Sequence, residues 1–129
     1  MTKHAAGTFS IDSWDQKSFE DPQLASAEVT KTFRGDIEGT CATKLLFAGN
    51  ETTGAAAYVG FERIIGSVHG KSGSFIMRHN AAKLGEDGTF SWAVVPGTGT
   101  EELAGLRGEG TITPEPDKSH SYTLDYDLD

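Results

Sequence analysis

The 129-residue chain has little cysteine, little positive charge and no long hydrophobic run. Cys41 is the only cysteine, so no disulfide can form within the chain, and a reducing compartment such as the cytoplasm is expected. Eleven Lys and Arg residues against nineteen Asp and Glu give a net charge of −8, which disfavours binding to nucleic-acid phosphates. No apolar run approaches the roughly 18 residues of a membrane-spanning helix. Residues 1–7 also lack the apolar centre of a signal peptide, so we expect a cytoplasmic protein with neither nucleic-acid nor membrane partners.

Motifs for metals and nucleotides are also scarce. The four histidines are separated by long stretches and none is paired with a cysteine, so no metal site is predicted. The segment GSVHGKS at 66–72 resembles a phosphate-binding loop, but Ile65 stands where that motif needs a glycine. The residues that follow it are typical of a strand, whereas a phosphate loop opens a helix. We therefore interpret 66–72 as a glycine-rich hairpin turn and predict no cofactor.

Glycine is abundant, at 16 residues, and short alternating segments fill the spaces between the glycines. The pattern is clearest over 25–37, where apolar residues share one parity and Lys31 is the exception. Such a period of two over about thirteen residues indicates a strand and not a helix. The same reasoning predicts eight strands, at 7–15, 25–37, 40–48, 55–68, 73–79, 89–95, 104–113 and 120–128.

Short connections between these segments predict an antiparallel arrangement, because parallel strands need long crossovers. A sheet of this size must stack on another sheet or close on itself, and glycines within strands favour the bends of a closed barrel. We therefore predict an all-β protein with an eight-stranded antiparallel barrel and Gly-rich strands, a two-layer sandwich being the alternative. Residues 1–6 are expected to be a flexible N-terminus and 7–129 a single domain.

Carboxylates within the strands are the main candidates for chemistry. Asp36 and Glu38 share a parity, and Glu62 stands between apolar neighbours. A desolvated carboxylate has a raised pKa if it is unpaired, which suits general acid or base catalysis, so these three are the predicted catalytic residues. The alternative is that the carboxylates pair with arginines in structural networks or lie on the outer surface. The polar pocket at the barrel mouth is predicted to include the binding residues Tyr58, Arg78, His79, Trp92, Arg107 and Glu109.

Cys41 lies in a predicted strand and is interpreted as a buried structural thiol.

Several segments together resemble a known family. They are GTFSIDSWD, VTKTFRGDIEGT, YVGFERIIGSVHGKSGSF and PGTGTEELAGLRGEG, followed by a Tyr-rich final strand. In this order they resemble a bacterial family of unknown function with an allene-oxide-cyclase-like, dirigent-like barrel. The resemblance implies an eight-stranded antiparallel barrel that often forms oligomers. Barrels of the wider superfamily bind apolar small molecules in the lumen and steer cyclisation or coupling, but no catalytic motif can be transferred.

Three hypotheses for function follow. The first is a barrel that binds an apolar small molecule in its lumen and acts as a cofactor-free cyclase or isomerase through its strand carboxylates. The second is a carboxylate-dependent hydrolase, such as an aspartic-type peptidase, with Asp36, Glu38, Glu62 and Glu109 as candidates. The third is a non-catalytic binding module that works as a homo-oligomer through apolar residues such as Val59, Phe61 and Ile65.

Overall fold

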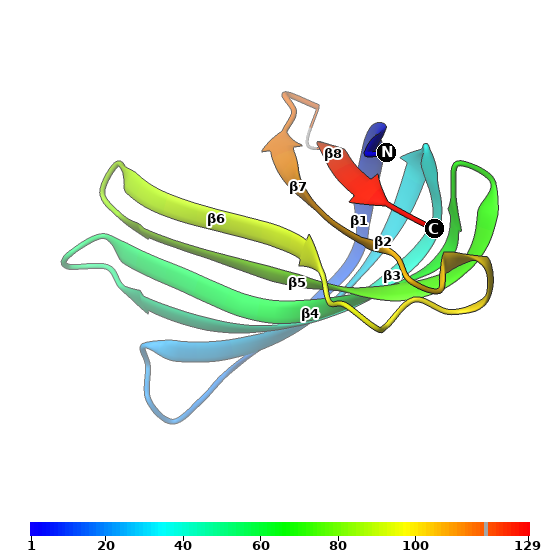
Figure 1. Ribbon diagram of the computed structural model, residues 1–129. Helices are drawn as coiled ribbons and strands as arrows, with labels where there is room; N and C mark the ends of the chain where they lie inside the picture. Colours follow the sequence, from blue (N-terminus) through cyan, green and yellow to red (C-terminus); the bar gives the residue numbers. More distant parts are fainter. Residues whose placement is uncertain (118) are drawn as a thin grey trace.

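A computed structural model describes residues 1–117 and 119–129 and shows a closed barrel of antiparallel strands (Figure 1). The strands are β1 (Lys3–Ser18), β2 (Leu24–Gly35), β3 (Ile37–Asn50), β4 (Ala55–Val68), β5 (Lys71–Leu84), β6 (Asp87–Val94), β7 (Arg107–Pro114) and β8 (His120–Asp127). One turn of 3₁₀ helix, η1 (Glu101–Leu103), lies between β6 and β7. The predicted all-β, eight-stranded antiparallel barrel is confirmed. Within the described residues, no helix is long and apolar enough to cross a membrane.

Each strand pairs with its neighbour in the sequence, and β1 pairs with β8 to close the barrel. The N-terminal segment takes part in this closure, because β1 begins at Lys3 and pairs with β8 from Lys3 to Phe9. Residues 3–6, which we predicted to belong to a flexible N-terminus, are thus part of the first strand. The pairing partner, β8, has the apolar residues Leu124 and Tyr126 on its inner face, and Ala5 packs with them in the core.

The hairpin between β4 and β5 has the shortest kind of turn. Val68 pairs with Lys71, and the two residues between them, His69 and Gly70, have φ values of 47° and 80°. Two positive φ values define the turn that matches the twist of paired strands, and they explain the glycine at this position. The hairpin turn predicted within 66–72 is therefore present, at His69 and Gly70, with the ends of β4 and β5 on either side. The hairpin between β5 and β6 has its turn at Gly85-Glu86, since Leu84 pairs with Asp87 and β6 begins at Asp87.

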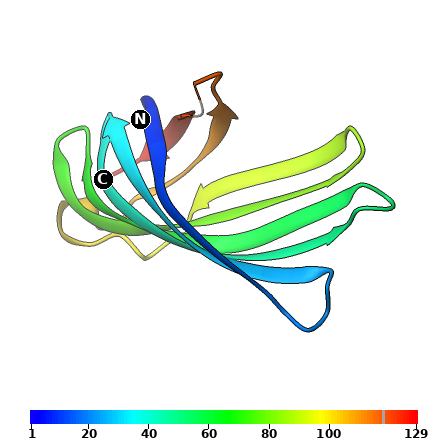
Figure 2. The same ribbon diagram turned by 180° about the vertical axis from the view of Figure 1, so that it is seen from behind.

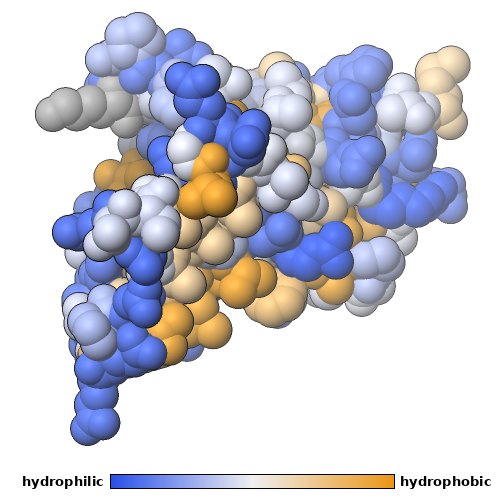
Figure 3. All heavy atoms as spheres, turned by 90° about the vertical axis from the view of Figure 1, so that its left-hand side faces the viewer, coloured by the Kyte–Doolittle hydropathy of each residue, from blue (hydrophilic) through white to orange (hydrophobic). Residues whose placement is uncertain are grey.

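The barrel is closed at one end and splayed at the other. β6 and β7 pair only at Trp92–Gly110 and Ala93–Glu109. Beyond these pairs, the long hairpins β1–β2, β3–β4 and β5–β6 extend past the short β7 and β8 as an open wing (Figures 1 and 2). Figure 3 looks at this open end, where hydrophobic side chains gather in the middle and lower part of the face and hydrophilic ones lie on both sides of them.

The closed end is filled by the hydrophobic core. Leu103 and Leu106, in the segment between β6 and β7, are buried there and join the same cluster as the strand residues. Aromatic rings make up much of this cluster, with Phe33 stacked 4.9 Å from Phe9 and 6.2 Å from Trp92, centroid to centroid. The core therefore seals one end of the barrel, and any internal space must lie toward the wing.

A pair of glycines lets two strands approach closely near the closed end. Gly39 of β3 pairs with Gly66 of β4, and a Cβ atom on Gly66 would overlap the carbonyl oxygen of Glu38. The carbonyl oxygen belongs to the backbone, so it cannot move away as the end of a flexible side chain could. Gly39 and Gly66 are therefore needed because the two backbones approach so closely.

We expect Gly66→Ala to lower the free energy of unfolding by about 1–3 kcal/mol, the usual cost of overpacking. Gly49→Ala is the matched control in the same pair of strands, since its Cβ would lie at 3.3 Å from the carbonyl oxygen of Ala55. Urea unfolding followed by circular dichroism measures both. Equal stability of the two variants would contradict the close approach.

Candidate functional site

A cavity of about 340 Å³ opens inside the barrel toward the wing. All eight strands contribute to its wall, which places it in the lumen. Its apolar lining consists of Phe9, Ile11, Trp14, Val29, Leu45, Phe47, Phe90, Ile112 and Pro114. Its polar lining consists of Lys31, Tyr58, His79 and His120. The cavity is thus an apolar chamber with a small number of polar groups, as small-molecule sites usually are.

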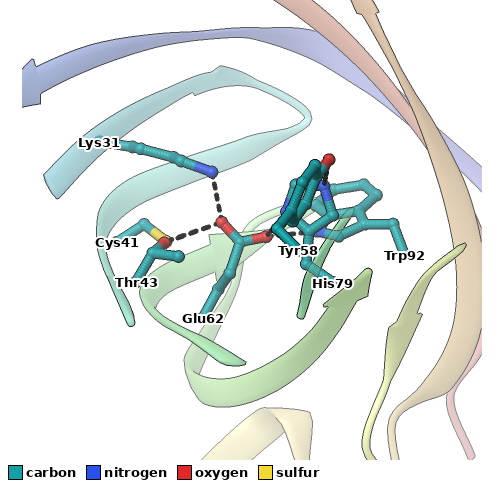
Figure 4. A network of polar contacts seen from close by, with 7 residues as sticks. All are labelled: Lys31, Cys41, Thr43, Tyr58, Glu62, His79 and Trp92. Atoms are coloured by element: carbon teal, nitrogen blue, oxygen red, sulfur yellow. Dashed lines mark hydrogen bonds and ion pairs between the residues drawn. The ribbon is translucent and has the colours of Figure 1, made fainter. Parts of the chain in front are cut away.

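A fully buried carboxylate, that of Glu62, lies next to the polar lining (Figure 4). Its Oε2 atom accepts hydrogen bonds from Lys31 Nζ at 2.5 Å and from Thr43 Oγ1 at 2.9 Å. Its Oε1 atom accepts a hydrogen bond from Trp92 Nε1 at 2.7 Å and lies 3.3 Å from His79 Nδ1. Donors from β2, β3 and β6 therefore converge on the two oxygens of one carboxylate, and His79 of β5 lies beside them.

The alternation along β4 explains why Glu62 points inward. Gly60, Glu62 and Ile64 are buried, whereas Phe61 and Arg63 between them are exposed. Glu62 pairs with Thr43 on one side, and Lys31 lies on the inner face of the next strand, β2. The same period of two therefore places Glu62 and its partners on one face of the sheet.

The charge of Glu62 is matched by its surroundings. Burial alone would raise the pKa of Glu62, but the neighbouring His79 and Lys31 outweigh this and hold the pKa well below its usual range. The carboxylate is therefore ionised at neutral pH. A buried charge is tolerated only when it is paired and hydrogen-bonded, and here Lys31, itself buried, supplies the opposite charge.

Tyr58 and His79 extend the network from Glu62 to the cavity. The Tyr58 hydroxyl lies 2.9 Å from His79 Nε2, and the two rings meet edge to face at 4.9 Å. Burial and the charge of Glu62 raise the pKa of Tyr58, so its hydroxyl is protonated at neutral pH. The order of groups, from the cavity inward, is hydroxyl, imidazole and carboxylate.

His120 and Lys31 line the other side of the chamber. His120 stacks on Phe9 at 4.8 Å, and the Lys31 ammonium lies 4.8 Å from the centroid of the same ring. Burial and the positive charge of Lys31 lower the pKa of His120, which keeps its imidazole neutral at pH 7. Lys31 therefore brings a positive charge to the cavity wall, and Glu62 balances it.

Four of the residues predicted from sequence meet at this site: Glu62, Tyr58, His79 and Trp92. The other five do not face the cavity. Asp36 lies between β2 and β3, where it accepts a hydrogen bond from the Ala6 amide and contacts His69. Glu38 is exposed five residues before Thr43, the partner of Glu62, and so lies toward the other end of the barrel. Arg78, Arg107 and Glu109 are exposed, and Arg107 pairs with Asp129.

Three polar residues of the site, Lys31, Thr43 and His120, were not predicted from sequence. Lys31 could have been identified from the sequence, because it is the one charged residue among the alternate positions of β2 that are otherwise apolar or glycine. Thr43 and His120 carried none, since a threonine or histidine in an alternating strand is common on either face. The anticipated arginine partners of the carboxylates do not reach Glu62, whose buried cation is a lysine.

A larger groove of about 770 Å³ lies at the tip of the wing and is lined mainly by alanines, leucines and glycines. Its charged residues, Asp21, Lys83 and Asp87, are all exposed. Metal binding has no geometric basis in the described part of the chain, where no three His, Cys, Asp or Glu side chains cluster suitably. The chemistry is therefore concentrated at the smaller, inner cavity.

A model of the family described as "Protein of unknown function (DUF3224)" matches residues 5–126. The chain belongs to this family. A DUF3224 protein of unknown function from Shewanella oneidensis MR-1 has a similar solved structure, with a TM-score of 0.89 and 25% identity over 100% of this chain and 98% of that chain. None of the curated proteins matches the chain. The predicted membership of a bacterial family of unknown function is thereby confirmed, and no activity comes with it.

We expect Glu62→Gln to lower the free energy of unfolding of this DUF3224 barrel by about 3–5 kcal/mol at pH 7, because it leaves the buried Lys31 ammonium unpaired. The pKa of Glu62 is depressed from an ordinary value of 4.5, so its ionisation stabilises the fold above that value. The stability difference between wild type and variant should therefore be full above about pH 5 and shrink as the pH falls below it.

Glu28→Gln is the matched control, because Glu28 forms an exposed pair with Lys44 at 3.7 Å. Exposed pairs contribute about 0–1 kcal/mol. Denaturant titrations of the three proteins between pH 3 and pH 8 give the comparison. A Glu62→Gln variant as stable as Glu28→Gln would show that the buried pair does not hold the structure.

The thiol of Cys41 should be inert in the folded protein. It is buried beside Glu62, and burial together with that charge raises the pKa of the thiol to about 12. Because the thiolate is the reactive form, Ellman's reagent should label the native protein only as fast as the protein unfolds. The unfolded protein in guanidinium should react at once, and equally fast labelling of both states would contradict the predicted burial.

Proposed function

We propose that this protein binds a small, neutral, apolar molecule in the inner cavity, with an oxygen atom of the ligand directed at Lys31. The observation that carries this proposal is the chamber of about 340 Å³ in which apolar walls surround one ammonium group. Ligand sites of this kind have volumes of roughly 300–1,000 Å³. The chamber lies at the small end of this range and suits a molecule of one or two rings.

The charge balance of the site indicates a neutral ligand. Lys31 and Glu62 cancel one another, and His120 is neutral, so a charged ligand would be buried without a counter-charge. An ammonium has three N–H donors, of which Glu62 engages one in the described structure, so others are left for a ligand oxygen. A carbonyl, hydroxyl or epoxide oxygen fits this donor.

The same geometry supports a cofactor-free isomerase or cyclase as the form of this function. Glu62 is ionised and shielded from solvent, and His79 lies between it and the Tyr58 hydroxyl at the cavity wall. Such networks perform proton transfer without any group beyond the protein's own side chains. A cytoplasmic location is part of the proposal, since one buried and unpaired thiol suits a reducing compartment.

An aspartic-type hydrolase is not favoured by the geometry. This chemistry needs two carboxylates close enough to share a proton. Of the four candidates, Glu62 alone is buried in the barrel, whereas Asp36, Glu38 and Glu109 lie at its surface.

An oligomeric binding module is the second candidate, and a specific observation supports it. Val59, Phe61 and Ile65 lie on the outer face of β4 and are 45%, 56% and 57% exposed. A strand that is apolar on both faces is typical of one covered on both sides. A homo-oligomer that buries this outer face is compatible with ligand binding in the lumen.

We expect β-tetralone, a bicyclic ketone, to bind to the wild-type protein about tenfold or more tightly than tetralin, the same molecule without the oxygen. A hydrogen bond to a charged donor contributes about 1.5–3 kcal/mol, and 1.4 kcal/mol is a factor of ten in affinity. The midpoint of thermal unfolding should rise with ligand concentration, because a ligand of the native state stabilises it.

Two neighbouring substitutions on β7 locate the binding. Ile112 lines the cavity, whereas the Thr111 side chain lies on the exposed face, where it contacts Thr123. Ile112→Trp should fill the chamber and abolish the thermal shift, and Thr111→Trp should leave it unchanged. A shift that survives Ile112→Trp would place binding elsewhere, for example in the groove at the tip of the wing.

A further inference from the structure

Three side chains form a continuous line from the cavity into the barrel. The Tyr58 hydroxyl lies 2.9 Å from His79 Nε2, and His79 Nδ1 lies 3.3 Å from Glu62 Oε1 (Figure 4). Glu62 is fully buried and His79 is buried, whereas Tyr58 and His79 both line the cavity. The outermost group of the line is therefore the one that a ligand would meet.

The positions of the protons follow from the two ends of the line. Glu62 Oε1, 3.3 Å from His79 Nδ1, is the nearest charged group to that buried nitrogen, which has no hydrogen-bond partner in the described structure, so the carboxylate favours a proton there. Nε2 then carries a lone pair and accepts the Tyr58 O–H. The tyrosine oxygen has its own lone pairs left, and these are available to a ligand.

We propose that Tyr58, His79 and Glu62 form a proton relay, and that the substrates are small apolar ketones with an acidic C–H bond next to the carbonyl. This inference rests on the proposed binding of an oxygen-bearing ligand in the same cavity. Tyr58 is the catalytic residue that touches the substrate, together with Lys31, which holds the carbonyl oxygen. His79 and Glu62 act through Tyr58 and are positioning residues.

The step is balanced without any further reactant. The C–H bond next to the carbonyl breaks and its proton bonds to the Tyr58 oxygen, while the former hydroxyl proton of Tyr58 passes to His79 Nε2. The electron pair of the C–H bond becomes the C=C bond of an enolate, and the carbonyl pair moves to the oxygen at the Lys31 ammonium. Return of a proton to the same carbon regenerates the ketone. In an unsaturated ketone, return to the far carbon of the conjugated system moves the double bond.

The charges of the site fit this step. Before it, the Lys31 ammonium and the Glu62 carboxylate sum to zero. After it, the new enolate faces Lys31 and the new imidazolium faces Glu62, so the sum is again zero. Lys31 and His79 contact different oxygens of one carboxylate, which keeps both new charges beside an existing opposite charge. Such preorganised partners are most effective in a dry site.

The experiment measures exchange of the acidic protons of β-tetralone for deuterium in heavy water, followed by proton NMR. We expect the wild-type protein to accelerate exchange over buffer, and Tyr58→Phe to lose about 100-fold or more of that acceleration, as expected for a general base. Tyr58→Phe should still bind the ketone with a Kd within about threefold of wild type, since the ring remains and only a transition-state contact is lost.

Tyr126→Phe is the matched control. The Tyr126 hydroxyl also contacts a histidine, His69 Nδ1 at 2.5 Å, but neither residue lines the inner cavity. This variant should exchange β-tetralone at the wild-type rate. His79→Gln tests the positioning role, because its amide can hydrogen-bond to Tyr58 but cannot take up a proton; binding should persist while exchange is lost.

The possible outcomes distinguish failure of the relay from failure of ligand binding. Ketone binding by the wild type without accelerated exchange overturns the relay and leaves the binding function intact. Acceleration that survives Tyr58→Phe, or that falls equally in Tyr126→Phe, also overturns the relay. Failure of the ketone to bind at all overturns the binding function and the relay together.

Discussion

The burial of the Glu62 carboxylate is the constraint on which the inner structure of this barrel depends. An ion of this kind loses its hydration when the barrel closes, and several kcal/mol are needed to compensate for it. Compensation comes from Lys31, Thr43, His79 and Trp92, which belong to β2, β3, β5 and β6. Because these strands must bring the four side chains to one point, the carboxylate fixes the positions of the strands relative to β4. The network of Glu62 with these four side chains is therefore a structural clamp, in the sense that it holds five strands in fixed positions, as well as a polar surface.

This clamp lies between two unlike halves of the lumen. Toward the closed end, Phe33, Trp92 and Tyr122 fill the interior, and the Tyr122 hydroxyl is itself engaged by the Ile37 amide at 2.8 Å. Toward the wing, β7 and β8 end early and the interior is not filled, which leaves the cavity. A barrel of eight strands has room for a core or for one small ligand. Here the unequal strand lengths provide both, with the Glu62 network at the boundary.

Much of the fold follows from local pattern, and the limits of the sequence reasoning have definite physical causes. The period of two in β2 and β4 predicted the strands and singled out Glu62, but parity alone could not decide which face is inside. For that reason Arg107 and Glu109 were expected at the pocket although they lie outside. A single bulge had a further effect: β1 shifts register between Ile11 and Ser13, which brings Trp14 to the cavity together with Phe9. A bulge of one residue leaves no clear trace in composition.

The three carboxylates predicted to be catalytic, Asp36, Glu38 and Glu62, do not lie together, and the cause is similar. Asp36 falls between β2 and β3, and Glu38 stands at the start of β3, so both lie near the hairpin end that faces away from the wing. Glu62 lies in the middle of β4, opposite Thr43, and distance along the strand separates it from them. The sequence shows which residues are near one another along a strand. Which residues of two different strands lie side by side depends on the register of strand pairing, and the sequence pattern does not determine that register.

The combination of ion pair and cavity argues for chemistry at this site. Replacing a buried ion pair with apolar side chains of similar size is often neutral or stabilising, so stability alone does not explain Lys31 and Glu62. The pair lies beside the inner cavity, and its histidine neighbour connects it to a hydroxyl on the cavity wall. A purely structural network would pair its own donors and acceptors and would leave no polar group facing the cavity. This one presents an ammonium and a hydroxyl to an apolar chamber, which is the arrangement that binding and proton transfer both require.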